Sequence, residues 1–106
     1  MAFTKKQVEK IEEFGWEVTE EKTKDNRIYA YELSKRTRCD LPFYVLLTYA
    51  TPLEDLEDYV EFFDEDEIIQ QIQNKGGFIP PRYTLWLDVK EIEEDLETLL
   101  EELRGL

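Results

Sequence analysis

The stretch Thr51–Asn74, TPLEDLEDYVEFFDEDEIIQQIQN, decides the fold that this sequence predicts. It holds nine of the chain's 26 acidic residues and has neither Lys nor Arg. Its apolar residues recur at helical spacing, beginning with Leu53, Leu56, Val60 and Phe63. Because such a stripe packs on a core, the acidic residues between its members face outward. We therefore expect two short helices, about Pro52 to Phe63 and Glu65 to Lys75, with a bend near Asp64.

Both of these helices have a start signal in the sequence. Thr51 with Glu54 makes a capping-box pattern, and Pro52 suits the first helical position. Asp64 with Glu67 repeats the capping pattern for the second helix. Acids in a first turn are also favoured by the helix dipole. Capping therefore accounts for part of the acidic content without any ligand.

A further helix is expected near the N-terminus, at about Lys5 to Phe14. Thr4 and Gln7 form its capping box. Gly15 stands where a left-handed residue commonly ends a helix.

The segment between this helix and the acidic stretch predicts three strands. Apolar and polar residues alternate over Trp16–Thr23 and again over Arg27–Ser34, and the turn residues between them predict a hairpin. Leu41–Ala50 is apolar at both parities, which is typical of a central strand with both faces at least partly covered.

The C-terminal third predicts one more strand and one more helix. Tyr83–Leu87 is expected to be a short strand, and Asp88 with Glu91 is expected to cap the helix after it. The apolar stripe of that helix is Val89, Ile92, Leu96, Leu99 and Leu103. The predicted order is αβββααβα: a single acidic α+β domain over residues 1–106, with a four-stranded, mostly antiparallel sheet packed by helices.

The composition excludes several classes of function. The chain has 106 residues and a formal net charge of −13, and residues 39–74 hold ten acids and no base. A chain this acidic repels nucleic acid and anionic membranes, so we expect neither as a direct partner. A single cysteine allows no internal disulfide, and no apolar run is long enough for a membrane span. The N-terminus also lacks an apolar signal core, so we expect a cytoplasmic protein.

Residues for catalysis are few. The chain has no His, and its single serine, Ser34, has no nucleophile motif around it. Asp64–Glu67 is a run of four acids, but Ile69 stands where a calcium loop needs glycine. Cys39 follows a basic run that favours a reactive thiol, although we prefer an ordinary reduced cysteine. We expect no enzyme activity and no cofactor, with a carboxylate enzyme that uses a divalent metal as an alternative.

The acidic surface itself is the main candidate site. A solvated helix face normally mixes charges, whereas Glu54–Asp58 and Glu57–Glu61 are like-charge pairs at i, i+4. Each such pair costs about 0.2–0.5 kcal/mol. We expect the surface to bind a partner, the alternative being that it is only solvated. The expected partner-binding residues are Glu54, Asp55, Glu57, Asp58, Glu61, Asp64, Glu65 and Asp66.

The predicted function is that of a non-catalytic acidic binding protein. We expect an inhibitor that occupies the basic nucleic-acid-binding surface of a partner protein, such as a nucleic-acid-binding protein or a nuclease. By analogy of charge and size, it is of the phosphate-mimic type found in phages and mobile elements, or of the immunity-protein type. The alternative is an assembly protein that oligomerises through the leucine stripe of its last helix. The sequence leaves monomer and dimer open.

Two other segments have two interpretations each. The basic loop Lys35–Arg38 either contacts the acidic helices and relieves repulsion, which we favour, or faces a second partner. Two prolines make Gly76–Pro81 a loop, in which Phe78 and Ile79 either form an exposed apolar contact or cover an edge of the core.

Overall fold

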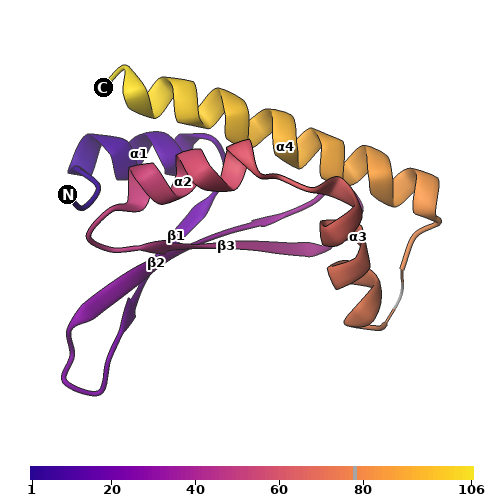
Figure 1. The fold of residues 1–106 in the computed structure, drawn as a ribbon, viewed down its shortest axis with the longest axis horizontal. Coiled ribbons are helices and arrows are strands. Elements are labelled where there is room, and N and C mark those ends of the chain that lie inside the picture. The colour runs from indigo at the N-terminus through magenta and orange to yellow at the C-terminus, as the bar shows by residue number, and fades with distance from the viewer. Residues whose placement is uncertain (78) are drawn as a thin grey trace.

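The computed structural model describes residues 1–77 and 79–106. In those residues the chain forms four helices and a three-stranded antiparallel sheet (Figure 1). The elements are α1 (Lys5–Glu13), β1 (Glu17–Lys22), β2 (Ile28–Arg36), β3 (Pro42–Thr48), α2 (Pro52–Glu61), α3 (Glu65–Asn74) and α4 (Arg82–Arg104). The α+β class is therefore confirmed. The expected fourth strand and the order αβββααβα are wrong, because the observed order is αβββααα.

The error lies in Tyr83–Leu87, which forms the first part of α4 instead of a strand. Leu85 is fully buried and lies one helical turn before Val89, so it extends the apolar stripe of α4. A helix satisfies its backbone hydrogen bonds internally, whereas a strand at this position would need a sheet edge. Asp88 is consequently inside the helix and buried, so the predicted capping box of Asp88 and Glu91 does not form.

The predicted hairpin is confirmed. β1 and β2 pair antiparallel, with Val18 opposite Leu33. In the turn between the strands, Asn26 adopts a φ of 65°, which Asn tolerates better than most residues. The tip of this hairpin projects beyond the helices (Figure 1).

The strand order is β1-β2-β3, so β2 is the central strand and β3 lies at an edge. Residues of β3 alternate between buried and exposed: Val45 is buried, whereas Tyr44 and Leu46 are exposed. The prediction of a central strand with both faces at least partly covered over Leu41–Ala50 is therefore wrong. Tyr44 and Leu46, the apolar residues that alternate with the buried ones, lie on the sheet face that the helices do not cover.

The helices cover one face of the sheet and enclose the core. In Figure 1, α1, α2 and α4 lie above the sheet, and α3 lies at the end of the sheet opposite the hairpin tip. α4 packs on the other three helices, while α1 contacts β1 and α2 contacts β3. The predicted stripe of α4 is buried, which confirms that it packs within the chain; its members are Val89, Ile92, Leu96, Leu99 and Leu103.

The start and the end of α1 agree with the sequence. The hydroxyl of Thr4 accepts a hydrogen bond from the backbone N–H of Gln7 at 3.1 Å, and the side chain of Gln7 accepts one from the N–H of Thr4 at 2.8 Å. Phe14 is the C-cap, and Gly15 follows it with a φ of 90°. That backbone conformation suits glycine because it has no Cβ.

The loop before α4 had two interpretations, an exposed apolar contact or cover for an edge of the core. Ile79 is partly buried against the core, so it covers a core edge. Phe78 falls outside the described residues. Among the described helices, none combines the length and the apolar character that a membrane crossing requires.

Candidate protein-binding surface

One row of carboxylates on α2 faces away from the protein. Glu54, Asp58 and Glu61 follow one another by four and three residues, so they share a side of the helix. All three are exposed, and within the described residues their side chains form no ion pair or hydrogen bond. The opposite side of α2 carries Leu56, which is fully buried. We call Glu54, Asp58 and Glu61 the free row.

Asp55, on one flank of the free row, is tied to the sheet. Its carboxylate accepts a hydrogen bond from the backbone N–H of Thr48 at 2.8 Å and lies 3.5 Å from the hydroxyl of Thr51. The hydrogen bonds from Thr48 lower the pKa of Asp55 below its ordinary value. Thr51 is the N-cap residue of α2 but makes no capping hydrogen bond, so the predicted capping box with Glu54 is wrong.

Glu57, on the other flank, is tied to α4. Its carboxylate lies 3.3 Å from Nε of Arg104. Both side chains are partly exposed, so the pair contributes little to stability. Its consequence is that the Glu57 charge already has a counterion within the chain.

The bend between the two acidic helices is confirmed, and Asp64 is the N-cap of α3 as predicted. One carboxylate oxygen of Asp64 accepts from the backbone N–H of Asp66 at 3.0 Å and of Glu67 at 3.2 Å. The side chain of Glu67 does not complete the capping box. Because α2 ends at Glu61, the like-charge pair that Glu61 would form with Glu65 in a continuous helix does not arise.

Two acids of the first turn of α3 are paired with bases of α4. Glu65 lies 3.2 Å from the ammonium of Lys90, and Asp66 lies 3.2 Å from the guanidinium of Arg82. Burial opposes ionisation of Glu65, but hydrogen bonds, led by that from Lys90, outweigh it and lower the pKa of Glu65. Burial and a hydrogen bond with Glu65 raise the pKa of Glu93 beside them.

The eight predicted site residues thus fall into two groups. Glu54, Asp58 and Glu61 are free, whereas the other five already have partners within the chain, and these are Asp55, Glu57, Asp64, Glu65 and Asp66. The structure brings the eight residues to one region, the α2–α3 bend and its flanks. It does not make them one uniform surface.

Exposed aromatic residues adjoin these acids. Phe62 is 75% exposed and Trp86 is 37% exposed, although both are large and apolar. They line an open hollow of about 470 Å³, with the rest of its wall from the bend: Glu61, Phe63, Asp64, Glu65 and Asp66. The sequence analysis missed Phe62, although its position off the buried stripe of α2 was the signal for an exposed apolar side chain. It also missed Trp86, which it assigned to a strand.

Comparison of the chain with protein-family models, with curated proteins and with solved structures finds no match. The chemistry of the surface is therefore the basis for assigning a function.

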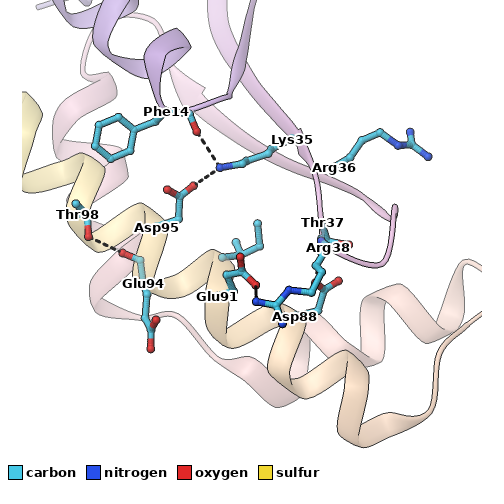
Figure 2. Close-up of a pocket in the computed structure, with 11 residues that line it drawn as sticks. Phe14, Lys35, Arg36, Thr37, Arg38, Asp88, Glu91, Glu94, Asp95 and Thr98 are labelled. Carbon is cyan, nitrogen blue, oxygen red and sulfur yellow. Dashed lines mark hydrogen bonds and ion pairs between the residues drawn. The ribbon is translucent and has the colours of Figure 1, made fainter.

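The basic loop relieves repulsion, but its partners differ from those expected. Lys35 lies 2.8 Å from Asp95, and Arg38 lies 2.7 Å from Glu91, so both bases pair with α4 and not with α2 or α3 (Figure 2). Arg36 pairs with Asp40 within the loop region at 2.6 Å. Figure 2 shows the three bases with Glu91 and Asp95 around a second cavity, of about 320 Å³.

This second cavity is a polar junction between α4 and the β2–β3 turn. Asp88, which is 3% exposed, accepts a hydrogen bond from the backbone N–H of Arg38 at 3.0 Å. Its other carboxylate oxygen has no partner among the described residues. Cys39, in the same turn, is a free and partly buried thiol. The Lys35, Arg36 and Arg38 charges are therefore matched by carboxylates close to them, and none of these three bases pairs with the free row within the described residues.

Proposed function

We propose that this protein is a non-catalytic acidic binding protein whose α2–α3 surface binds a basic partner protein. The single observation that carries the proposal is the free row. Three exposed carboxylates on one side of α2 have no counterion within the described residues, while the neighbouring acids Glu57, Glu65 and Asp66 do. A basic partner would supply the missing counterions.

The distribution of bases supports this proposal. The chain has 13 Lys and Arg residues, and α4 directs Arg82, Lys90 and Arg104 to Asp66, Glu65 and Glu57. No base is directed to Glu54, Asp58 or Glu61 in the described structure. Like charges at this spacing destabilise a helix, so the free row has a cost to the isolated protein. Binding of a cationic surface would offset that cost.

The concrete form that we propose is an inhibitor that occupies a nucleic-acid-binding surface. At about 1.5 Å of rise per residue, the free row spans about 10 Å of helix axis. A DNA strand places a phosphate about every 3.4 Å, so about four phosphates extend over the length that holds the three carboxylates. A surface that binds a phosphate row would therefore find a comparable density of negative charge on α2. Electrostatic attraction of this kind gives fast, salt-sensitive association.

The assembly alternative loses its proposed contact. The apolar stripe of α4 is buried against α1, α2 and α3, so a second copy has no access to it unless the fold opens. We therefore do not propose oligomerisation through these leucines.

A pull-down from host lysate tests the proposed function, with three forms of the protein as bait. The first is the parent, the second carries Glu54→Gln, Asp58→Asn and Glu61→Gln, and the control carries three charge-neutralising changes on the projecting hairpin: Glu17→Gln, Glu20→Gln and Asp25→Asn. Both variants lose the same amount of charge, so general electrostatics affects them equally. All six side chains are exposed, so both variants should fold.

We expect the parent and the hairpin control to recover a nucleic-acid-binding protein that is released by high salt and competed by DNA or RNA. The free-row variant should recover little of it. Equal recovery by both variants would show that charge location is irrelevant and would contradict the proposed surface.

A further inference from the structure

We propose that the hollow at the α2–α3 bend receives an arginine side chain from a basic segment of the partner protein. This inference rests on the proposed function and names the group that the surface recognises. The hollow combines two features that a guanidinium uses and a simple ammonium uses less well. Its lining includes two exposed aromatic residues, Phe62 and Trp86, and it has carboxylates beside them.

The aromatic part comes from two elements. Phe62 is the C-cap of α2 and is three-quarters exposed, and Trp86 projects from the second turn of α4. Both rings line the same hollow although they are 24 positions apart in the chain. Tyr83, 72% exposed, stacks on Trp86 with ring centroids 6.5 Å apart and extends the aromatic surface. Isolated exposed aromatic residues are common, whereas contiguous exposed apolar side chains often mark a contact surface.

The carboxylate part comes from the bend. Glu61 and Asp64 line the hollow without an ion pair in the described structure. Asp64 uses one oxygen to cap α3, which leaves its second oxygen for an incoming donor. A guanidinium has five N–H donors in one plane, so it can bond carboxylates while its face lies on an aromatic ring.

The protein already holds cations in this way nearby. The ammonium of Lys90 lies 5.9 Å from the centroid of the Trp86 ring and 3.2 Å from a carboxylate oxygen of Glu65. Arg82 pairs with Asp66 at the rim of the same hollow, and both side chains are largely exposed. The chain's own residues thus demonstrate cation binding between a carboxylate and an aromatic ring. The Phe62 side of the hollow is where a cation from outside fits.

Charge decides the class of partner. The net charge of −13 repels nucleic acid, so the aromatic residues do not serve as a platform for bases. A protein segment that contains arginine satisfies both the acids and the rings. Lysine satisfies the acids but stacks less well on an aromatic ring.

The experiment compares two synthetic peptides of equal charge, nine-residue oligoarginine and nine-residue oligolysine. Their affinities for the intact protein are measured by calorimetry in the same buffer. We expect oligoarginine to bind at least fivefold more tightly than oligolysine. Tryptophan emission should change with oligoarginine, since Trp86 is accessible and the second tryptophan, Trp16, is only 2% exposed.

Two variants locate the effect. Phe62→Ala should reduce the affinity for oligoarginine to that for oligolysine, and its exposure means that the fold should be retained. Leu46→Ala is the matched control, because Leu46 is also an exposed apolar residue, at 64%, and lies on the open sheet face. It should leave the preference for arginine unchanged.

The outcomes separate this inference from the proposed function. If both peptides bind equally and both lose affinity with Glu54→Gln, Asp58→Asn and Glu61→Gln, the acidic surface binds cations but the arginine site is overturned. If the preference for arginine survives Phe62→Ala, the site is again overturned. If neither peptide binds at low salt, both the site and the proposed function are overturned.

Discussion

The indole N–H of Trp16 donates a hydrogen bond to a carboxylate oxygen of Asp95 at 2.9 Å, across 79 positions of the chain. The same oxygen lies 2.8 Å from the ammonium of Lys35, which also donates to the backbone carbonyl of Phe14. Asp95 of α4 therefore joins the end of α1, the start of β1 and the end of β2. No feature of local sequence predicts this junction.

Removing the Asp95 carboxylate should destabilise the fold. Asp95→Ala leaves the indole and the ammonium without their acceptor, at a cost of about 2–3 kcal/mol in the free energy of unfolding. Asp95→Asn retains one acceptor oxygen and should cost about half as much. Glu94→Ala, an exposed neighbour on α4, is the control and should stay within about 0.5 kcal/mol of the parent. Urea denaturation measures all three, and equal stability of the Asp95 and Glu94 variants would contradict the role of the junction.

A side chain at Gly15 should destabilise the protein. The φ of 90° at Gly15 is unfavourable for other residues, so Gly15→Ala should lower the free energy of unfolding by about 1–2 kcal/mol. A Cβ at this position would meet only the end of the Lys35 side chain, at 3.5 Å, so backbone strain is the cause. Gly105→Ala is the control, because Gly105 has a φ of −82° and no such strain. The melting temperature should fall for the first variant only.

The two threonine N-cap residues should contribute differently to the free energy of unfolding. Thr4 makes a complete capping box, so Thr4→Ala should cost about 1 kcal/mol. Thr51 occupies the equivalent position of α2 without a capping hydrogen bond. Thr51→Ala should therefore lower the free energy of unfolding by only about a few tenths of a kcal/mol. Chemical denaturation of the two variants side by side tests this difference. Equal losses would mean that the Thr51 hydroxyl caps α2 in solution.

A carboxylate pair on the open sheet face should make stability depend on pH. A hydrogen bond with Glu21 raises the pKa of Glu32, and burial and the negative charge of Glu21 raise it further. Because the folded state binds this proton more tightly than the unfolded state does, the stability gained from it is present at low pH and is lost as the pH rises through the pKa of Glu32. Glu21→Gln should therefore stabilise the protein near neutral pH, and its advantage should shrink as the pH falls toward about 4.

Glu20→Gln is the control for that pH experiment, since it removes the same charge from an exposed position on the adjacent residue. Its effect should be smaller near neutral pH. A stabilisation by Glu21→Gln that grows on acidification would have the wrong sign and would contradict the explanation.

Local signals predicted the parts of the fold that local chemistry decides. The capping box of Thr4, the cap at Asp64 and the hairpin turn at Asn26 depend on residues within a few positions of one another. Tyr83–Leu87 failed because a run of five residues is too short for its apolar pattern to distinguish a strand from a turn of helix. Long-range packing of Leu85 decided between the two. β3 failed for a similar reason, since whether helices cover one sheet face or two is a property of the whole fold.

The candidate surface was predicted as a region but not in its internal division. The sequence shows where the acids lie along α2 and α3, and helical spacing shows that they point outward. It does not show that three bases of α4, up to 47 positions away, pair with the neighbouring acids. These pairs are Arg104 with Glu57, Lys90 with Glu65 and Arg82 with Asp66. The aromatic part of the hollow depends on the same long-range packing, because Trp86 comes from α4.

α4 also determines when the protein can fold during its synthesis. Among the described residues, this one helix supplies seven of the 18 buried side chains of the core. Before the ribosome has translated Arg82–Arg104, the first three helices and the sheet therefore lack these seven core side chains. Until then the nascent chain exposes apolar surface that chaperones recognise. We expect folding to be completed only after α4 has left the exit tunnel.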